Sequence, residues 1–169
     1  MADPTLNTRN EQQYVAIAAT VTMDEFSRVP GLSHDVYGWL GGQGLTPSGP
    51  SFVRILTSDM AAKLDIEVGV TVDGAVTGDE RIVVGSIPQG SYVTLVYGAA
   101  DQDEHIQANA QLQAWAAEHV LEWEMVHTSS GDVWGGRFQF YLEDQSSEGN
   151  QIFELIYLVT EESAERATI

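Results

Sequence analysis

The chain has 169 residues, of which 25 are acidic and 7 basic, giving a formal net charge of −18. Its length suits one globular domain, and an apolar content of 43% supports a core and argues against global disorder. So few basic side chains disfavour direct nucleic-acid binding, and the absence of cysteine excludes disulfides and thiolate metal sites. The acidic surface favours cationic small molecules or basic protein surfaces, or it only aids solubility.

The first part of the chain predicts a loose leader followed by a strand and a helix. Residues 1–12 are polar, residues 13–23 are β-rich, and the segment that follows, to residue 44, reads as a helix that Pro30 and Gly31 kink or divide. Further strands are expected at residues 49–57, 64–72, 81–86, 91–99, 135–144 and 151–159.

Residues 101–120 give the strongest helix signal, because this segment is rich in Ala and Gln and has acids at its start. The tail over residues 161–169 is polar and is expected to fray. A single domain over residues 13–160 is therefore predicted. The N-terminus has no signal-peptide pattern and no apolar run is long enough for a membrane span, which fits a cytoplasmic protein without membrane contact.

The order of these elements repeats, which indicates an internal duplication of residues 14–72 and 92–159. The segment YVAIAATV resembles YVTLVYGA, and the ungapped match of GPSFVRILTSD with GGRFQFYLEDQ places Phe52 on Phe138. The same alignment brings Glu67 close to Glu154. The second half carries an extra segment, EWEMVHTSSGDVW, before its last two strands.

Glu154 stands in the otherwise apolar strand QIFELIYLV, and three interpretations are open. It faces solvent, it forms a structural salt bridge to Arg54 or Arg137, or it is a pocket carboxylate. Strand alternation gives it aliphatic neighbours on its own face, Ile152 and Ile156 among them, which argues against exposure of that face to solvent. A carboxylate in such a pocket would have a raised pKa, which suits either cation binding or general acid–base catalysis.

Glu67 shares its face with smaller and more polar residues, Asp65, Gly69 and Thr71. Gly69 would leave open space beside it. A structural or solvent-facing role is therefore favoured for Glu67 over ligand binding, although it stays a candidate.

The segments GPSFVR, LDIEVGVTV, GSIPQGSYVTLVYGA, LQAWAAEHVLE and FELIYLV, in this order, resemble the GyrI-like family, the effector-binding domain of AraC- and MerR-type multidrug regulators. The resemblance covers Tyr14 to Thr160. It implies an α+β fold in which duplicated strand–helix–strand–strand units form a curved antiparallel sheet, with two main helices and a pocket between the halves. It also implies that Glu154, on the last strand, meets cationic lipophilic drugs among aromatic side chains. Thr71 and Leu158 depart from the family's prolines.

Six aromatic residues are candidates for lining this pocket: Tyr97, Phe52, Phe138, Phe140, Tyr141 and Trp134. Strand alternation puts Phe138 and Phe140 on one face and Tyr141 on the other, and which set faces the pocket stays open. Trp134, in the extra segment, is either a lid or a surface anchor.

The resemblance implies a binder of lipophilic small molecules, cationic ones included, that senses or sequesters a drug or natural product. A short leader leaves no room for a helix-turn-helix, so the chain is expected to act alone or with a separate protein. The first alternative is a hydrolase that opens cyclopropane rings of DNA-alkylating natural products, with Glu154 as its catalytic residue. The second is an acidic protein-inhibitory module that acts on DNA gyrase.

No cofactor and no metal are expected, because the histidines are scattered and the sequence lacks HExxH, phosphate-loop and G-x-S-x-G patterns.

Overall fold

The computed structural model describes residues 3–58, 63–129, 131–145 and 151–167. The strands are β1 (Thr5–Arg9), β2 (Gln12–Thr22), β3 (Pro47–Ser58), β4 (Lys63–Val72), β5 (Ile82–Ile87), β6 (Gly90–Ala99), β7 (Met125–Thr128), β8 (Gly131–Trp134), β9 (Arg137–Gln145) and β10 (Gln151–Leu158). The helices are α1 (Val29–Gly42), α2 (Gln102–Glu118) and α3 (Glu161–Ala167), with a 3-10 helix η1 (Met23–Arg28) before α1.

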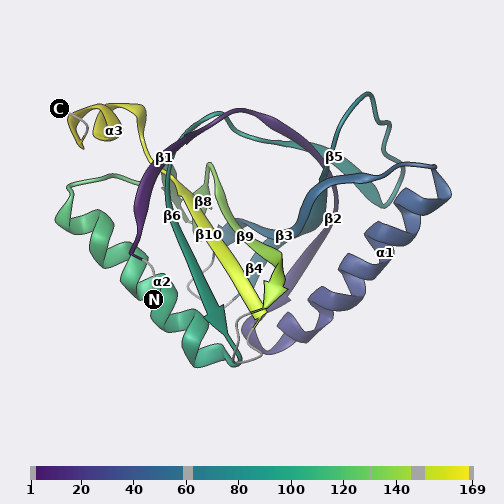
Figure 1. The fold of residues 1–169 in the computed structure, drawn as a ribbon, viewed down its shortest axis with the longest axis horizontal. Coiled ribbons are helices and arrows are strands. Elements are labelled where there is room, and N and C mark those ends of the chain that lie inside the picture. Colours follow the sequence, from purple (N-terminus) through teal and green to yellow (C-terminus); the bar gives the residue numbers. More distant parts are fainter. Residues whose placement is uncertain (1–2, 59–62, 130, 146–150, 168–169) are drawn as a thin grey trace.

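These ten strands form one curved, unclosed antiparallel sheet, and the expected α+β fold is confirmed (Figure 1). The order across the sheet is β1-β6-β10-β9-β3-β4-β2-β5, with the β7–β8 hairpin attached to β3. Read from its centre, between β9 and β3, this order is symmetric, because β10 and β4, β6 and β2, and β1 and β5 occupy matching places. The duplication seen in the sequence is therefore a twofold relation within one sheet.

The register places the two glutamates at equivalent positions. Glu67 lies between Ala18 of β2 and Arg54 of β3, and Glu154 lies between Val96 of β6 and Phe140 of β9. The central strands pair Phe52 with Phe140 and Arg54 with Phe138. A twofold axis between β3 and β9 exchanges Phe52 with Phe138 and Arg54 with Phe140. It therefore converts the first of these pairs into the second.

The expectation of a loose leader over residues 1–12 is corrected by β1, which pairs with β6. Leu6 packs against the core of the second half, and Asn7 Nδ2 donates to the hydroxyl of Thr94 at 2.9 Å. The equivalent strand of the second half, β5, pairs with β2 of the first. Each half therefore gives its leading strand to the other half, a pairing between distant segments that local polarity does not reveal.

The tail also departs from the expectation, because residues 161–167 form α3 and do not fray. Its residue Ser163 is fully buried, and the Ser163 hydroxyl accepts a hydrogen bond from the backbone N–H of Glu122 at 3.1 Å. Ala164 packs beside it in the core. This short helix of seven mostly polar residues is thus held by tertiary contacts, not by its own helix propensity.

The segment from residue 23 to 44 is divided near Pro30, as the sequence indicated: α1 begins at Val29 with the proline in its first turn. In the second half, α2 begins after Asp101, whose side chain accepts a hydrogen bond from the backbone N–H of Glu104 at 3.0 Å. The extra segment forms β7 and β8, and β8 pairs with the end of β3.

The two faces of the sheet differ. Helices α1 and α2 both pack on one face, which we call the helix face, with buried residues such as Leu40 and Leu112 at the contacts. The opposite face, which we call the inner face, holds a separate buried cluster. Its members are Tyr14, Ala16, Phe52, Ile87, Tyr92, Phe138, Phe140, Ile156 and Leu158.

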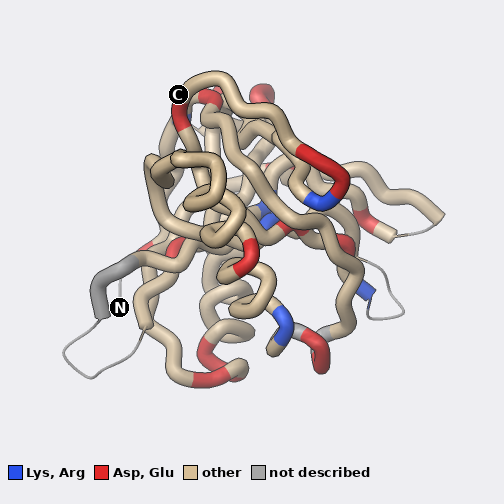
Figure 2. Tube along the Cα trace, turned by 90° about the vertical axis from the view of Figure 1, so that its right-hand side faces the viewer, with Lys and Arg blue, Asp and Glu red and all other residues tan. Residues whose placement is uncertain are grey.

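Acidic residues are spread over many elements, whereas basic residues are few (Figure 2). Among the described residues, no helix is both long and apolar enough to cross a membrane.

Candidate functional site

Glu154 lies on the inner face of β10, and its carboxylate is paired with an arginine. Oε2 of Glu154 accepts a hydrogen bond from Nη2 of Arg9 at 2.9 Å, and the two side chains are 21% and 28% exposed. The partner expected from the sequence was Arg54 or Arg137. The cation comes instead from β1, at the edge of the sheet. A partly desolvated carboxylate is costly when unpaired, so Arg9 stabilises Glu154 in the ligand-free protein.

Glu67 is satisfied in a different way, within its own half. The hydroxyl of Tyr14 donates a short hydrogen bond to its carboxylate, and Nη1 of Arg54 donates to the Tyr14 oxygen at 2.8 Å. Burial and the hydrogen bond to Glu67 raise the pKa of Tyr14, which keeps the phenol a donor. The open space expected beside Gly69 is absent, because an added Cβ there would clash with the Val15 carbonyl oxygen.

The two arginines meet near Tyr92, which is fully buried. Burial raises the pKa of Tyr92 to about 12, and the charges of Arg54 and Arg9 both work against that rise. The hydroxyl of Tyr92 donates to the Pro88 carbonyl at 2.7 Å. On the inner face, Glu154 is thus paired with Arg9, and Glu67 is linked to Arg54 through the Tyr14 hydroxyl.

The phenylalanines predicted for the site pack against one another on this face. The rings of Phe52 and Phe138 have centroids 5.6 Å apart, as do those of Phe52 and Phe140, and the three side chains are at most 4% exposed. The guanidinium of Arg54 lies 5.0 Å from the centre of the Phe138 ring. These residues form a wall behind the charged groups and expose little surface of their own.

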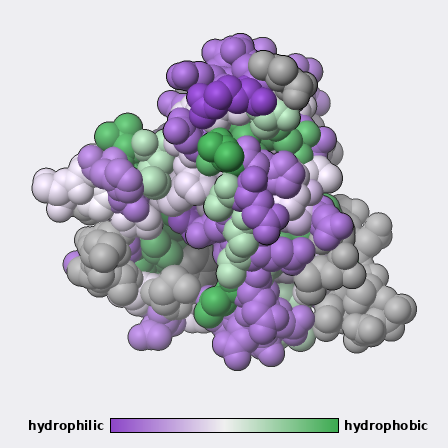
Figure 3. All heavy atoms as spheres, turned by 90° about the vertical axis from the view of Figure 1, so that its left-hand side faces the viewer, coloured by the Kyte–Doolittle hydropathy of each residue, from purple (hydrophilic) through white to green (hydrophobic). Residues whose placement is uncertain are grey.

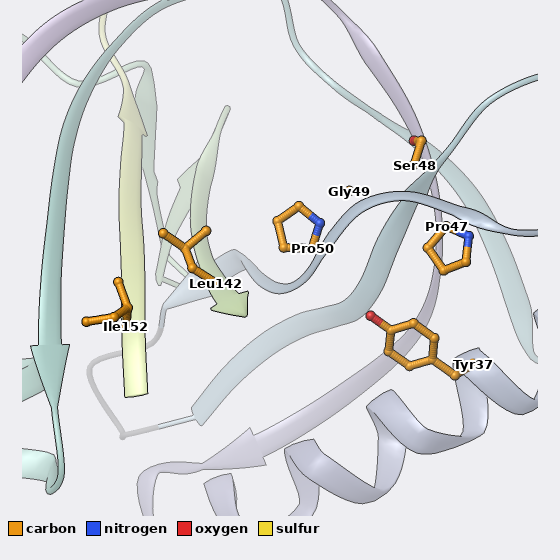
Figure 4. A pocket seen from close by; sticks show the side chains of 7 residues that line it. All are labelled: Tyr37, Pro47, Ser48, Gly49, Pro50, Leu142 and Ile152. Carbon is orange, nitrogen blue, oxygen red and sulfur yellow. The ribbon is translucent and has the colours of Figure 1, made fainter. Parts of the chain in front are cut away.

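A cavity of about 700 Å³ opens between the start of β3, the second half of β9 and the start of β10 (Figure 4). Its lining residues are Tyr37, Pro47, Ser48, Gly49, Pro50, Leu142 and Ile152. Figure 4 shows Leu142 and Ile152 on one side of the cavity and Tyr37, which comes from α1, on the other. Glu154 lies two residues after Ile152 and on the same face of β10, beyond the cavity lining.

Tyr97 and Tyr141 lie on the other face of the sheet, the helix face. The hydroxyl of Tyr97 is 2.8 Å from Nδ1 of His105, a residue of α2. Phe153 lies between these side chains, with its ring centroid 5.6 Å from Tyr97, 4.6 Å from His105 and 5.1 Å from Tyr141. Burial raises the pKa of Tyr97 and lowers that of His105, while the nearby carboxylates of Glu104 and Asp101 oppose the change at His105.

A second cavity, of about 390 Å³, lies between α2 and the strands β3 and β9, and we call it the α2 groove. His105, Tyr141 and Gln139 contribute to its lining. Sequence reasoning missed His105 as a site residue. The signal was present in the helical period, since His105 precedes the buried Ala108 and Leu112 by three and seven residues on one face of α2.

Trp134 is buried, at 8% exposure, within the core of the helix face. Its indole N–H donates to the hydroxyl of Ser58 at 3.1 Å, and the guanidinium of Arg137 lies 4.7 Å from its ring centre. The side chain anchors β8 against β3 and does not hang over a cavity mouth.

The sheet thus divides the candidate residues into two sets. Glu154, Glu67 and the three phenylalanines lie on the inner face, and Tyr97, Tyr141 and Trp134 lie on the helix face. The period-two alternation that left the choice open in the sequence separates them physically. Within the described ranges, no cluster of three or more His, Asp or Glu side chains could hold a metal ion.

Solved structures with this fold are numerous. The chain superimposes on the C-terminal domain of EcmrR with a TM-score of 0.69 at 14% identity, covering 94% of this chain and 98% of that one. SAV2435 bound to tetraphenylphosphonium gives a TM-score of 0.61 at 14% identity, with 96% and 97% covered. A protein described as a hydrolase from Listeria innocua gives a TM-score of 0.61 at 14% identity, and the match covers 94% of this chain and 92% of that one. At such identities the likeness shows the fold alone.

No curated protein sequence matches the chain significantly. The family model of the GyrI-like small molecule binding domain matches residues 2–124, most of the chain. This match and the symmetric sheet agree, and the chain belongs to the GyrI-like family of small-molecule-binding domains.

Proposed function

We propose that the domain binds a lipophilic small molecule on the inner face and that Glu154 meets a cationic group of this ligand. The ion pair between Glu154 and Arg9 carries the proposal. The carboxylate of Glu154 is partly buried and requires a cation. In this structure the cation is Arg9, a long side chain on the edge strand β1. A ligand cation can take the place of Arg9 without disturbing the core.

The surroundings of Glu154 support ligand access. Val96, directly opposite Glu154 on β6, is 41% exposed, so apolar surface lies open beside the carboxylate. Ile152 extends the same face into the cavity of about 700 Å³, a volume within the range of small-molecule pockets. The lipophilic cation in the SAV2435 structure is a ligand of the class proposed here.

Two substitutions should shift the affinity for tetraphenylphosphonium in opposite directions. Glu154→Gln keeps the shape and removes the charge, and we expect about tenfold weaker binding or more. Arg9→Gln removes the competing cation, and we expect severalfold tighter binding because Glu154 is then unpaired. Isothermal titration calorimetry measures both.

Arg81→Gln is the matched control, because it also removes one positive charge but from an exposed pair with Asp35. It should leave the affinity within about twofold of the unsubstituted protein, as expected of an exposed charge. Equal affinities of the Glu154→Gln variant and the unsubstituted protein would remove Glu154 from the site. Tighter binding in Arg81→Gln as well would reduce the effect at Arg9 to one of net charge.

Hydrolysis of a reactive ligand is the second candidate, because a carboxylate beside an apolar cavity can act as general acid or base. A neighbour with this fold is described as a hydrolase. Incubation with a cyclopropane-bearing alkylating agent tests the idea. Ring-opened product beyond one equivalent of protein, lost in Glu154→Gln, supports it, and product limited to one equivalent refutes it for that agent.

A further inference from the structure

The α2 groove differs in charge from the rest of the molecule. The chain carries a net charge of −18, yet none of the described residues that line this groove is an aspartate or glutamate. These lining residues are aliphatic, amide and aromatic, and the guanidinium of Arg137 is the one permanently charged group among them. The groove is therefore a place where an anion meets a cation on an otherwise repelling protein.

Arg137 is held in position by two aromatic rings. Its guanidinium carbon lies 4.7 Å from the centre of the Trp134 ring and 4.9 Å from that of Tyr157. The charge of Arg137 lowers the pKa of Tyr157 against the rise caused by burial, and the five N–H donors of a guanidinium can serve a ligand. A guanidinium fixed in this way loses little freedom when it binds a carboxylate through two parallel hydrogen bonds.

Arg137 also lacks an acidic partner. Arg9, Arg28, Arg81 and Arg166 each form an ion pair with a carboxylate. Among the residues that the structure describes, no carboxylate lies within ion-pair distance of Arg137. Arg54 has no ion pair with a carboxylate either, but its guanidinium donates to the Tyr14 hydroxyl and to the carbonyls of Ser86 and Gly135. Arg137 instead lies against aromatic rings in a groove, which points to a ligand that supplies the carboxylate.

The other lining residues present flat aromatic surface. His105 and Tyr141 line the groove, and both rings are set against Phe153 and thereby fixed. Gln139 approaches Nδ1 of His105 at 3.4 Å, so an amide and an imidazole lie beside these rings. A planar ring can stack here, and the volume of about 390 Å³ suits one or two fused rings.

We propose that the α2 groove binds a planar aromatic carboxylate, with Arg137 holding the carboxylate and with His105 and Tyr141 flanking the ring. The proposal does not depend on the inner-face ligand, because the sheet separates the two sites. A protein partner fits this side less well. The face of the molecule that carries α2 and α3 is largely hydrophilic, with its apolar groups in several small, separate patches (Figure 3).

A matched pair of probes tests the charge, 1-naphthoate and the neutral 1-naphthylmethanol. We expect naphthoate to bind at least tenfold tighter by calorimetry, and Arg137→Gln to reduce its affinity to that of the alcohol. Quenching of tryptophan fluorescence gives a second readout, because Trp134 lies against Arg137. Arg81→Gln again controls for net charge and should retain the preference.

A second variant guards against misfolding of Arg137→Gln. Ile106 lines the groove and is 55% exposed, so Ile106→Glu should fold normally and repel the anion. We expect naphthoate to bind severalfold more weakly to Ile106→Glu than to Ile106→Gln, with little change for the alcohol.

Equal affinity for the two probes, no naphthoate binding at millimolar concentration, or unchanged binding in both Arg137→Gln and Ile106→Glu would each overturn the proposal. Loss of naphthoate binding in Arg9→Gln, with Arg137→Gln unaffected, would move the anion to the inner face and overturn it as well. Tetraphenylphosphonium should not compete with naphthoate. Its binding and the response of Glu154→Gln report separately on the inner-face ligand, so failure of one site is distinguishable from failure of the other.

Discussion

The roles of Glu67 and Glu154 diverge because of one residue on the neighbouring strand. Glu67 lies across from Arg54, and Glu154 at the equivalent place lies across from Phe140. The first carboxylate therefore accepts from a phenol of its own half, and Arg54 donates in turn to that phenol. The second must take its cation from β1, which makes it the more readily displaced of the two pairs.

His105 provides a test at the same scale through pH. Burial lowers its pKa in the folded protein, so the unfolded chain, with an ordinary histidine pKa of about 6.5, takes up the proton first. Stability contributed by neutral His105 is therefore present above pH of about 6.5 and falls as the pH drops from there toward the lower folded pKa. Urea unfolding should show that the free energy of unfolding falls less steeply between pH 7.5 and 5 in His105→Gln than in the unsubstituted protein. The difference in slope should correspond to the uptake of roughly one proton. Parallel pH profiles would contradict this.

At the scale of elements, the long strands and helices and the short strand β5 were predictable from the sequence, whereas β1 and α3 were not. Residues 91–99 and 101–120 carry strong strand and helix patterns, and the structure places β6 and α2 there. β1 and α3 have no such pattern, because both are stabilised by contacts with residues far along the chain. The same holds for the candidate site: Glu154 was identified as unusual from its apolar neighbours, but its pairing with Arg9 depends on the exchange of leading strands between the halves.

This exchange predicts a local effect when β1 is removed. In a variant that lacks residues 1–9, β6 becomes an open sheet edge, which favours association with other chains. We expect faster hydrogen exchange in β6 and concentration-dependent self-association by analytical ultracentrifugation, with β4 in the centre of the other half unaffected. Arg9→Gln keeps the strand and loses only the ion pair, so it should show the same association state as the unsubstituted protein. Self-association of that variant would assign the effect to charge.

At the scale of the whole molecule, the distribution of charge separates the surface from the two cavities. Acidic residues lie along many elements, as Figure 2 shows. On the inner face, Glu154 is paired with Arg9 and Glu67 is linked to Arg54 through Tyr14, and the α2 groove carries Arg137. We therefore expect ligand preference to follow the local pairing of charges and not the net charge. The net charge of −18 acts instead on the stability of the fold.

Two electrostatic contributions respond to salt in opposite directions. Exposed ion pairs such as Arg81 with Asp35 are weakened by screening, but each contributes only about 1 kcal/mol or less. Repulsion among the excess carboxylates is relieved by the same screening, whose range is about 10 Å at 0.1 M salt. Because the chain has 25 acidic and only 7 basic residues, relief of repulsion should dominate. We therefore expect the free energy of unfolding to rise as sodium chloride increases from about 0.02 to 0.3 M.

A variant with Glu11, Glu80 and Glu118 changed to Gln removes three exposed carboxylates and should show a smaller rise. A fall in stability with salt, or the same dependence in both proteins, would show that attractive pairs outweigh the repulsion.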